Sequence, residues 1–433
     1  MTAGRIYDVV VLGGGPAGLG SALNCARQGL SVLLLEQQPI GATRKSWLTF
    51  RDCIERYGLQ ECIRHEFSGV VFSSYLGGRF AFKDSRFICP IDEIRALTAL
   101  AGAARAAGAE LRERESYLNH CPDAKADTVT VTSSENTYQA KLVVDAMGRC
   151  SETLRSIGLA NETLDMGCVC RYLEGVKHRN DECLLLYDSF FPGPDYFWLV
   201  PLEKDRMMAG LFFFSSLTDQ NRSAKRAKLE RYIEARRLGG KVTGVREGNI
   251  PLGPQVNIAA DRTVCIGDSA NTPLPSSGFS FNRCLAESEV LAKFARRFVD
   301  GDVAVGDYKH EVLGAKTPAI EVHLMISDML SSFTDPMLNM AIAGMNRLDE
   351  EFLVSFLSGR DMSITFAANA LRAILRTFSL GELSSLSLKQ HHLRNLTNLY
   401  NLLPALPSAG VPRQLRDFIL SLARPAGAKR PQR

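Results

Sequence analysis

The stretch that decides the fold is "YDVVVLGGGPAGLGSALNCARQGLSVLLLEQQ", residues 7–38. Its β-branched run DVVVL predicts a short buried strand, and glycines in the spacing Gly-x-Gly-x-x-Gly follow at once. Residues 17–28 carry Ala and Leu at helical spacing and predict a helix, and SVLLLE predicts a second buried strand that ends in Glu36. A strand, these glycines, a helix and an acid about twenty positions further on form the fingerprint of a dinucleotide-binding unit.

Each part of this fingerprint has a physical role. Gly13 allows the tight turn, Gly15 allows the backbone to approach a pyrophosphate, and Gly18 allows the helix to pack on the strand. The helix N-terminus would offer N–H groups and a positive dipole end to the pyrophosphate. Glu36 would accept hydrogen bonds from the adenosine ribose and disfavours a 2′-phosphate, so FAD or NAD is expected rather than NADP. The alternative is a glycine-rich turn that binds nothing. The residues expected to bind the dinucleotide are Gly13, Gly15, Pro16, Ala17, Gly18 and Glu36.

Composition excludes several classes of protein. The chain has 433 residues, of which 45% are hydrophobic and 23% charged, as in a globular protein of two or three domains. A net charge of +4 gives no argument for a nucleic-acid partner, and no apolar run reaches the roughly 18 residues of a membrane span. Eleven irregularly spaced cysteines without a secretory leader indicate reduced thiols and a cytoplasmic location. The seven histidines are scattered, and the pair His391-His392 lacks further ligand spacing, so no metal site is expected.

Two later segments repeat the pattern of a strand followed by a glycine-containing turn. An apolar strand at 142–144 leads into Asp145-Ala146-x-Gly148-Arg149-x-Ser151, and RTVCIGDSAN at 262–271 runs into Gly267-Asp268. Parallel strands from such distant segments would direct their turns toward one crevice.

With these motifs in this order, the sequence resembles the FAD-dependent fold shared by aromatic hydroxylases, geranylgeranyl reductases, flavin-dependent halogenases and lycopene cyclases. The resemblance covers most of the chain and implies FAD as the cofactor, with Asp268 on its ribityl chain. It also implies that Pro275-Ser276-Ser277-Gly278-Phe279 passes beside the isoalloxazine ring. The further FAD-binding residues expected from this resemblance are Gly148, Asp268, Pro275, Ser277, Gly278 and Phe279.

The loop at 275–279 has two compatible interpretations. A glycine before a helix would offer N–H groups to the pyrimidine side of the flavin, and a helix over 279–298 would add its positive dipole end. Both would stabilise negative charge on a reduced flavin. The plainer interpretation is a helix-entry turn in which Ser276 or Ser277 is the N-cap.

The expected fold class is α/β: a Rossmann-type FAD-binding domain with an inserted antiparallel β-sheet substrate domain and a helical C-terminal region. Apolar and aromatic runs separated by turn residues predict the antiparallel sheet, which one basic helix at 223–238 interrupts. The C-terminal region carries breaks at Asp335-Pro336 and Gly359, and its methionines line either an adaptable pocket or plain core. The first part of the FAD-binding domain is expected at 1–150, with an inserted segment at about 41–90, and its second part at 256–305. The substrate domain is expected at 151–255 and the helical region at 306–420. A disordered basic tail is expected at 421–433.

Three residues are candidates for the substrate cavity. Tyr196-x-Trp198-x-Val200-Pro201 is similar to Tyr-x-Trp-x-Phe-Pro of geranylgeranyl reductases and to Trp-x-Trp-x-Ile-Pro of halogenases, and it differs from both at one position. Tyr196 and Trp198 are either an aromatic wall facing substrate and flavin or packed strand aromatics. Lys45 resembles the halogenase lysine without the accompanying glutamate, and is otherwise a loop cation near the FAD phosphates or in solvent.

The chemistry would then be that of the flavin, because no Ser-His-Asp or Cys-His set can be assembled. Lycopene cyclases depend on an acidic motif after the proline-containing strand, whereas AGLFFFSS at 209–216 has no carboxylate, which disfavours cyclisation. We therefore expect an FAD-dependent oxidoreductase of secondary metabolism that acts on a polyketide-like, prenyl or aromatic substrate, either free or carrier-bound. A monooxygenase is slightly favoured over a reductase, and a halogenase, a non-redox cyclase and a flavin-binding interaction protein remain alternatives.

The single dinucleotide fingerprint bears on the source of electrons. NAD(P)H would have to bind transiently or act through a separate flavin reductase. The basic, proline-rich tail is expected to lie in solvent, with contact to a membrane surface as the minor alternative.

Overall fold

The computed structural model describes residues 5–42, 47–123, 127–149, 151, 153, 164–176, 183–253 and 257–379. Lys45, the pair His391-His392 and the tail at 421–433 lie outside the described residues. The helical C-terminal region expected at 306–420 is described as far as residue 379.

The first sheet has eight strands in the order β16-β17-β10-β1-β2-β7, with β9 paired to β10 and β8 to β9. Strands β17, β10, β1, β2 and β7 are parallel, so their carboxyl ends lie at one edge. The register pairs Leu12 with Asp145 and Leu35, and Asp145 with Cys265. The bounds are β1 (Ile6–Leu12), β2 (Val32–Glu36), β7 (Glu110–Glu113), β8 (Tyr117–Asp123), β9 (Thr128–Ser133), β10 (Thr137–Asp145), β16 (Ala259–Ala260) and β17 (Thr263–Cys265).

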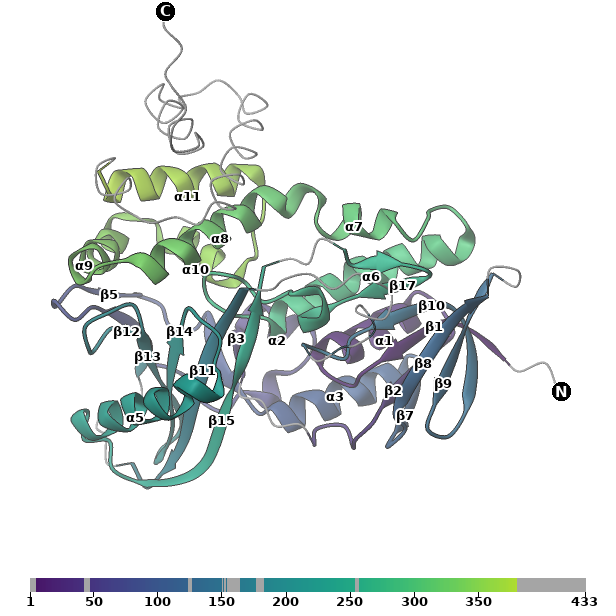
Figure 1. Ribbon diagram of the computed structural model, residues 1–433, viewed down its shortest axis with the longest axis horizontal. Helices are drawn as coiled ribbons and strands as arrows, with labels where there is room; N and C mark the ends of the chain where they lie inside the picture. Colours follow the sequence, from purple (N-terminus) through teal and green to yellow (C-terminus); the bar gives the residue numbers. More distant parts are fainter. Residues whose placement is uncertain are drawn as a thin grey trace, which may run out of the picture.

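Both faces of this sheet are covered (Figure 1). Because successive side chains of a strand point to opposite faces, Val9 and Val11 pack in the cluster formed with the helices, whereas Val10 and Leu12 pack with β9. Helix α1 contacts both α3 and α6. The predicted strand–helix–strand unit is therefore present, and its helix begins at the proline. These helices are α1 (Pro16–Arg27), α3 (Glu93–Ala106) and α6 (Phe281–Asp300).

The second sheet has seven strands in the order β15-β11-β14-β13-β12-β4-β5. Every neighbouring pair is antiparallel except β12 with β4, which agrees with the predicted antiparallel sheet. Two of its strands, β4 and β5, come from the segment at 41–90. The bounds are β4 (Gly69–Ser73), β5 (Arg79–Ala81), β11 (Leu164–Glu174), β12 (Cys183–Asp188), β13 (Tyr196–Glu203), β14 (Arg206–Phe213) and β15 (Lys241–Leu252).

One face of the second sheet is covered by the basic helix, α5 (Asp219–Ala235), which starts earlier than the sequence pattern suggested. Its buried residues are Leu229 and Tyr232, and its charged residues are mostly exposed, as predicted for a solvated face. Residues 47–91 contain four further elements. They are β3 (Trp47–Phe50), α2 (Arg51–Arg56), the short 3-10 helix η1 (Gln60–Cys62) and β6 (Ile88–Ile91).

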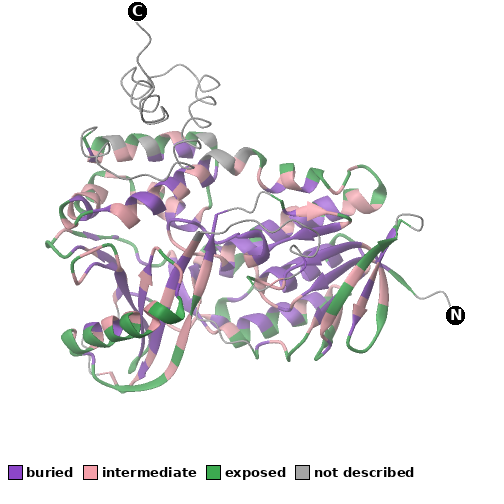
Figure 2. Ribbon diagram, viewed as in Figure 1, coloured by how far each residue is buried: buried purple, intermediate pink, exposed green. Residues whose placement is uncertain are grey.

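The other face of the second sheet packs against the C-terminal helices in a large shared core (Figure 2). The breaks expected at Asp335-Pro336 and Gly359 are confirmed: the first pair opens α9, and Gly359 ends α10 with φ +63°. Met325, Met329 and Met337 are buried in this core. The elements are α7 (Asp307–Val312), η3 (Gly314–Lys316), α8 (Thr317–Ser332), α9 (Asp335–Gly344), η4 (Met345–Arg347), α10 (Glu350–Ser358) and α11 (Ile364–Thr377).

Within the described ranges, no helix combines the length and the apolar character that a membrane crossing requires.

Candidate functional site

Three turns from distant parts of the chain meet at the carboxyl edge of the first sheet. The N–H of Gly13 donates to the carbonyl of Leu35 at 2.8 Å, and the N–H of Ala146 donates to that of Leu12 at 2.9 Å. The N–H of Ile266 donates to the carbonyl of Asp145 at 3.0 Å. These bonds hold the ends of β2, β1, β10 and β17 side by side, so the three sequence motifs lie next to one another at this edge.

The three fingerprint glycines meet different surroundings. Gly13 has φ +102°, and a Cβ atom there would lie 2.6 Å from the carbonyl oxygen of Ala146. A Cβ atom at Gly18 would lie 1.9 Å from the carbonyl oxygen of Gly13. At Gly15, by contrast, a Cβ atom would meet no described atom within 4 Å. Gly13 and Gly18 are thus required by the fold, whereas Gly15 leaves open space beside the start of α1.

The N-terminus of α1 is suited to an anion. Gly15 is the N-cap and Pro16 occupies the first turn, and in this fully described helix no side chain caps the end and no acidic residue lies in the first turn. The first N–H groups of a helix have no partner within the helix, and they carry the positive end of its dipole. This arrangement fits a pyrophosphate, as the sequence predicts.

Glu36 lies at the end of β2 beside the same turn. Its Oε2 atom accepts the N–H of Gly14 at 2.6 Å, and its Oε1 atom accepts the N–H of Gln38 at 2.8 Å. These bonds fix the carboxylate. A carboxylate oxygen can accept more than one hydrogen bond, so both atoms can also accept from ribose hydroxyls.

Asp145 joins two of the turns, a role that the sequence motif did not reveal. Its carboxylate is completely buried and accepts hydrogen bonds from the N–H of Met147 at 3.0 Å and from the hydroxyl of Ser151. The hydroxyl oxygen of Ser269 lies 3.1 Å from Oδ1 of Asp145 and 3.0 Å from the carbonyl oxygen of Gly148. Burial raises the pKa of Asp145. Asp145 therefore positions the turn that contains Gly148.

Gly267 brings Asp268 to the N-terminus of α1. It has φ +72°, and a Cβ atom there would lie 2.7 Å from Cβ of Ala17. The 3-10 helix η2 (Gly267–Ala270) therefore approaches α1 more closely than another residue would allow. Asp268, in this helix, is half-buried.

The loop that follows is a tight turn. The carbonyl of Leu274 accepts the N–H groups of Ser277 at 3.1 Å and Gly278 at 2.7 Å. The N–H of Gly278 is expected to face a flavin, but in this structure it donates to the carbonyl of Leu274 within the loop. Gly278 has φ +72°, and a Cβ atom there would lie 2.6 Å from Cε of Met166. Phe279 is half-buried, and its ring packs edge-on against that of Phe50, with 4.9 Å between the ring centroids.

Two details of the sequence interpretation are corrected here. Helix α6 begins at Phe281 rather than at residue 279, and its N-cap is Ser280, so neither Ser276 nor Ser277 is the cap. The hydroxyl of Ser276 instead lies 2.7 Å from Nδ1 of His323, and the hydroxyl of Ser277 donates to the carbonyl of Leu357 at 3.3 Å. Both serines are engaged by the C-terminal helices, which local sequence could not indicate.

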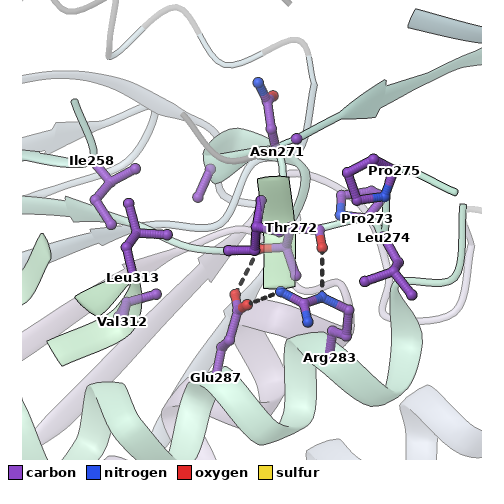
Figure 3. A pocket seen from close by; sticks show the side chains of 13 residues that line it. Ile258, Asn271, Thr272, Pro273, Leu274, Pro275, Arg283, Glu287, Val312 and Leu313 are labelled. Atoms are coloured by element: carbon purple, nitrogen blue, oxygen red, sulfur yellow. Dashed lines mark hydrogen bonds and ion pairs between the residues drawn. The ribbon is translucent and has the colours of Figure 1, made fainter. Parts of the chain in front are cut away.

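Behind the loop lies a cavity of about 20 Å³, which is large enough for a water molecule and too small for an organic ligand (Figure 3). Arg283 and Glu287 line it, and Nη2 of Arg283 donates to Oε1 of Glu287 at 2.9 Å. The hydroxyl of Thr272 donates to Oε2 of Glu287 at 2.7 Å, and Nε of Arg283 donates to the carbonyl of Thr272 at 2.8 Å. This buried ion pair holds the start of the loop against α6.

Tyr196 and Trp198 lie on the face of β13 that meets the C-terminal helices. Both are buried, and the Tyr196 ring stacks on Tyr187 with 4.2 Å between centroids. The hydroxyl of Tyr196 lies 3.7 Å from Sδ of Met166, whose methyl group approaches Gly278. Tyr196 and Trp198 are therefore packed strand aromatics. Met166 contacts both Tyr196 and the loop, and so connects them.

Gly210 is a further residue that sequence reasoning missed. It pairs with Trp198 across β13 and β14, and a Cβ atom there would lie 2.0 Å from Cζ2 of the indole. The indole thus covers Gly210. Nε1 of Trp198 has no hydrogen-bond partner among the described residues. Lys45, the third cavity candidate, lies outside the described part of the chain.

Known proteins share this fold. The chain is similar to digeranylgeranylglycerophospholipid reductase 2 of Methanopyrus kandleri, with 27% identity over 68% of this chain and 78% of the relative. The structure is similar to that of a geranylgeranyl bacteriochlorophyll reductase-like protein from Thermoplasma acidophilum, with 18% identity, a TM-score of 0.72 and coverage of 88% of this chain and 99% of that one. It is also similar to the flavin-dependent brominase Bmp2, with 18% identity, a TM-score of 0.69 and coverage of 86% and 99%. A match over residues 8–386 shows that the chain belongs to the lycopene cyclase protein family.

Proposed function

We propose that this chain is an FAD-dependent oxidoreductase that acts on a hydrophobic prenyl-type substrate. The open space at Gly15 carries the cofactor assignment, because Gly15 is the uncapped N-cap of α1. The N–H of the adjacent Gly14 is bound by the carboxylate of Glu36. A pyrophosphate would bind beside Gly15, in the turn that Gly13 and Gly18 shape, and the adenosine ribose at Glu36. The residues proposed for the remainder of the cofactor are Gly148, Asp268, Pro275, Ser277, Gly278 and Phe279.

The substrate would lie at the border of the apolar cluster beside the loop, where Phe279 is half-buried. Tyr196 and Trp198 belong to the apolar cluster that the second sheet forms with the C-terminal helices, and Phe279 borders the same cluster. The named activities of the two reductase relatives involve geranylgeranyl groups, and an apolar, methionine-containing wall suits such chains. These observations favour a prenyl substrate over a polar one.

FAD, when bound, would supply the redox chemistry, and the protein would contribute binding, orientation and exclusion of water. Reduction of a prenyl double bond is the first candidate reaction, since the curated relative is a reductase. Oxygen insertion is the second, because the same dry apolar face would shield an oxygen-reactive flavin from water. In either case NAD(P)H would act transiently or through a separate flavin reductase.

Cyclisation by a strand-borne acid is disfavoured. None of the buried residues of β13 and β14, all of which the structure describes, is acidic. The segment at 209–216, where the family resemblance led us to look for a carboxylate, contains none.

The test is to purify the full chain, measure its bound flavin by absorbance, and reduce it anaerobically in the presence of a geranylgeranyl lipid. Reductase activity predicts a product heavier by two hydrogens for each double bond, formed without oxygen. In a second arm, oxygen is admitted to the reduced protein and lipid, and a product that gains one oxygen atom, with matching oxygen consumption, would identify a monooxygenase. A colourless protein that takes up no FAD would contradict the proposal.

A further inference from the structure

The C-terminal helices hold the loop that borders the proposed flavin site. Oγ of Ser276 lies 2.7 Å from Nδ1 of His323 on α8, and the hydroxyl of Ser277 donates to the carbonyl of Leu357 on α10 at 3.3 Å. Immediately after the loop, Nδ2 of Asn282 donates to the carbonyl of Ser358 at 2.7 Å. Three contacts therefore join residues 276–282 to helices that lie 47 to 80 positions further along the chain.

His323 has an unusual environment for a polar side chain. It is completely buried, and its ring stacks on that of Phe356 with 4.5 Å between centroids and 25° between planes. The ring of Phe366 also packs beside His323, with 6.0 Å between the ring centroids. Nε2 has no hydrogen-bond partner among the described residues, so Ser276 is the polar contact that the structure assigns to this ring.

The imidazole is neutral near pH 7. Burial lowers the pKa of His323 to about 3, and the positive charge of Arg283 acts in the same direction. A neutral ring contributes a directional hydrogen bond rather than a charge. Its contact with Ser276 can therefore fix the position of the loop without adding a charge beside the flavin site.

We propose that His323 is a positioning residue of the cofactor site, which acts through Ser276 to hold Pro275–Gly278 where the loop borders the flavin. This inference rests on the proposed function, since it assumes that FAD binds beside the loop. It makes helix α8 a part of the cofactor site, although α8 follows the last FAD motif in sequence by about forty residues. The plainer alternative is that the pair only satisfies two polar groups in the core.

The test compares four variants of the full-length protein: His323→Leu, His323→Asn, Ser276→Ala and the double variant His323→Leu/Ser276→Ala. FAD affinity is measured by quenching of flavin fluorescence, and the thermal midpoint of the FAD-free protein is measured separately. Loss of one hydrogen bond predicts a roughly 2- to 10-fold weaker affinity for His323→Leu and for Ser276→Ala. The double variant should bind FAD as the weaker single variant does, because both changes remove the same contact. His323→Asn should bind nearly as the parent does, since an amide at that position can replace Nδ1.

Ser331→Ala is the matched control in the same helix, because the hydroxyl of Ser331 donates to the carbonyl of Asp328 within α8. It should leave FAD affinity unchanged. Parent-like FAD affinity in both His323→Leu and Ser276→Ala, with only the thermal midpoint lowered, would overturn the positioning role, as would additive losses in the double variant. If His323→Leu does not fold, Ser276→Ala and His323→Asn carry the test. A parent protein that binds no FAD would instead overturn the proposed function, and this inference with it.

Discussion

Gly18 lies so close to Gly13 that a Cβ atom on Gly18 would be 1.9 Å from the carbonyl oxygen of Gly13. Gly15, two positions after Gly13, has no described atom within 4 Å of the place where its Cβ would lie. The same motif therefore contains glycines that the fold requires and one that a ligand requires. Substitutions at these positions should have opposite effects on folding and on cofactor binding.

Gly15→Val should abolish FAD binding and leave the protein folded. Its side chain would occupy the open space into which a pyrophosphate fits, and the backbone at Gly15, with φ −79° and ψ −176°, suits a β-branched residue. The flavin absorbance of the purified protein and the thermal midpoint without FAD are the two measurements. Normal FAD content would show that the pyrophosphate does not approach Gly15.

Gly18→Ala should destabilise the protein even without FAD, because the new methyl group would clash with the backbone at Gly13. Overpacking of this kind costs about 1–3 kcal/mol, and more where the backbone must move. Urea denaturation gives the free energy of unfolding. Gly102→Ala is the matched control: Gly102 is an exposed residue of α3 with no described atom near its Cβ position, and alanine there should stabilise the helix by about 0.5–1 kcal/mol. Equal stability of the two variants would contradict the prediction.

Arg283→Met alone should destabilise the protein more than Arg283→Met combined with Glu287→Leu. Both charged side chains are buried, so removal of Arg283 leaves a carboxylate without its partner, at a cost of about 3–5 kcal/mol. Replacement of both charges avoids most of that cost. Unfolding free energies of the parent, the single and the double variants test this, and a double variant less stable than the single would refute it.

Gly210→Ala should disturb the packing of Trp198, because the indole lies over Gly210. We expect a loss of about 1–3 kcal/mol in unfolding free energy and a change in tryptophan fluorescence. The chain has only two tryptophans, which makes the signal easy to interpret. Gly248→Ala on β15, which β11 separates from β14, is the control. No described atom lies within 4 Å of its Cβ position, so the variant should leave the emission unchanged.

The stability difference between the parent and His323→Leu should change with pH. The pKa of His323 is lowered to about 3 in the folded protein from an ordinary value of 6.5. Between these values the unfolded chain takes up a proton that the folded one does not, so this group weakens the parent as the pH falls from 6.5 toward 3. The free energy of unfolding of the parent therefore falls by at most about 1.4 kcal/mol for each pH unit through this group, and the variant lacks this contribution. Urea denaturation of both proteins from pH 7 to pH 4 should show the difference shifting in favour of the variant, and a constant difference would disprove the lowered pKa.

Local sequence was sufficient for the parts of the fold that depend on short-range periodicity. The unit from Ile6 to Glu36 was predictable because a β-branched run, a glycine spacing and a helical repeat each constrain only a few neighbouring residues. The breaks at Asp335-Pro336 and Gly359 were predictable for the same reason, since proline and glycine act on the backbone at their own position. The two-sheet architecture followed from the order of such local signals.

The contacts of the site depend on residues that the chain brings together from far apart. Ser276 meets His323 across 47 positions, and Ser269 meets Asp145 across 124. Local composition made Ser276 a candidate helix cap, but a hydroxyl takes whichever partner the folded chain places within reach. The chain's own pattern thus accounts for the dinucleotide unit and its glycines. Long-range packing alone accounts for the partner of Ser276, the indole over Gly210 and the buried carboxylate that joins two turns, because side-chain partners depend on distance in space rather than on distance in sequence.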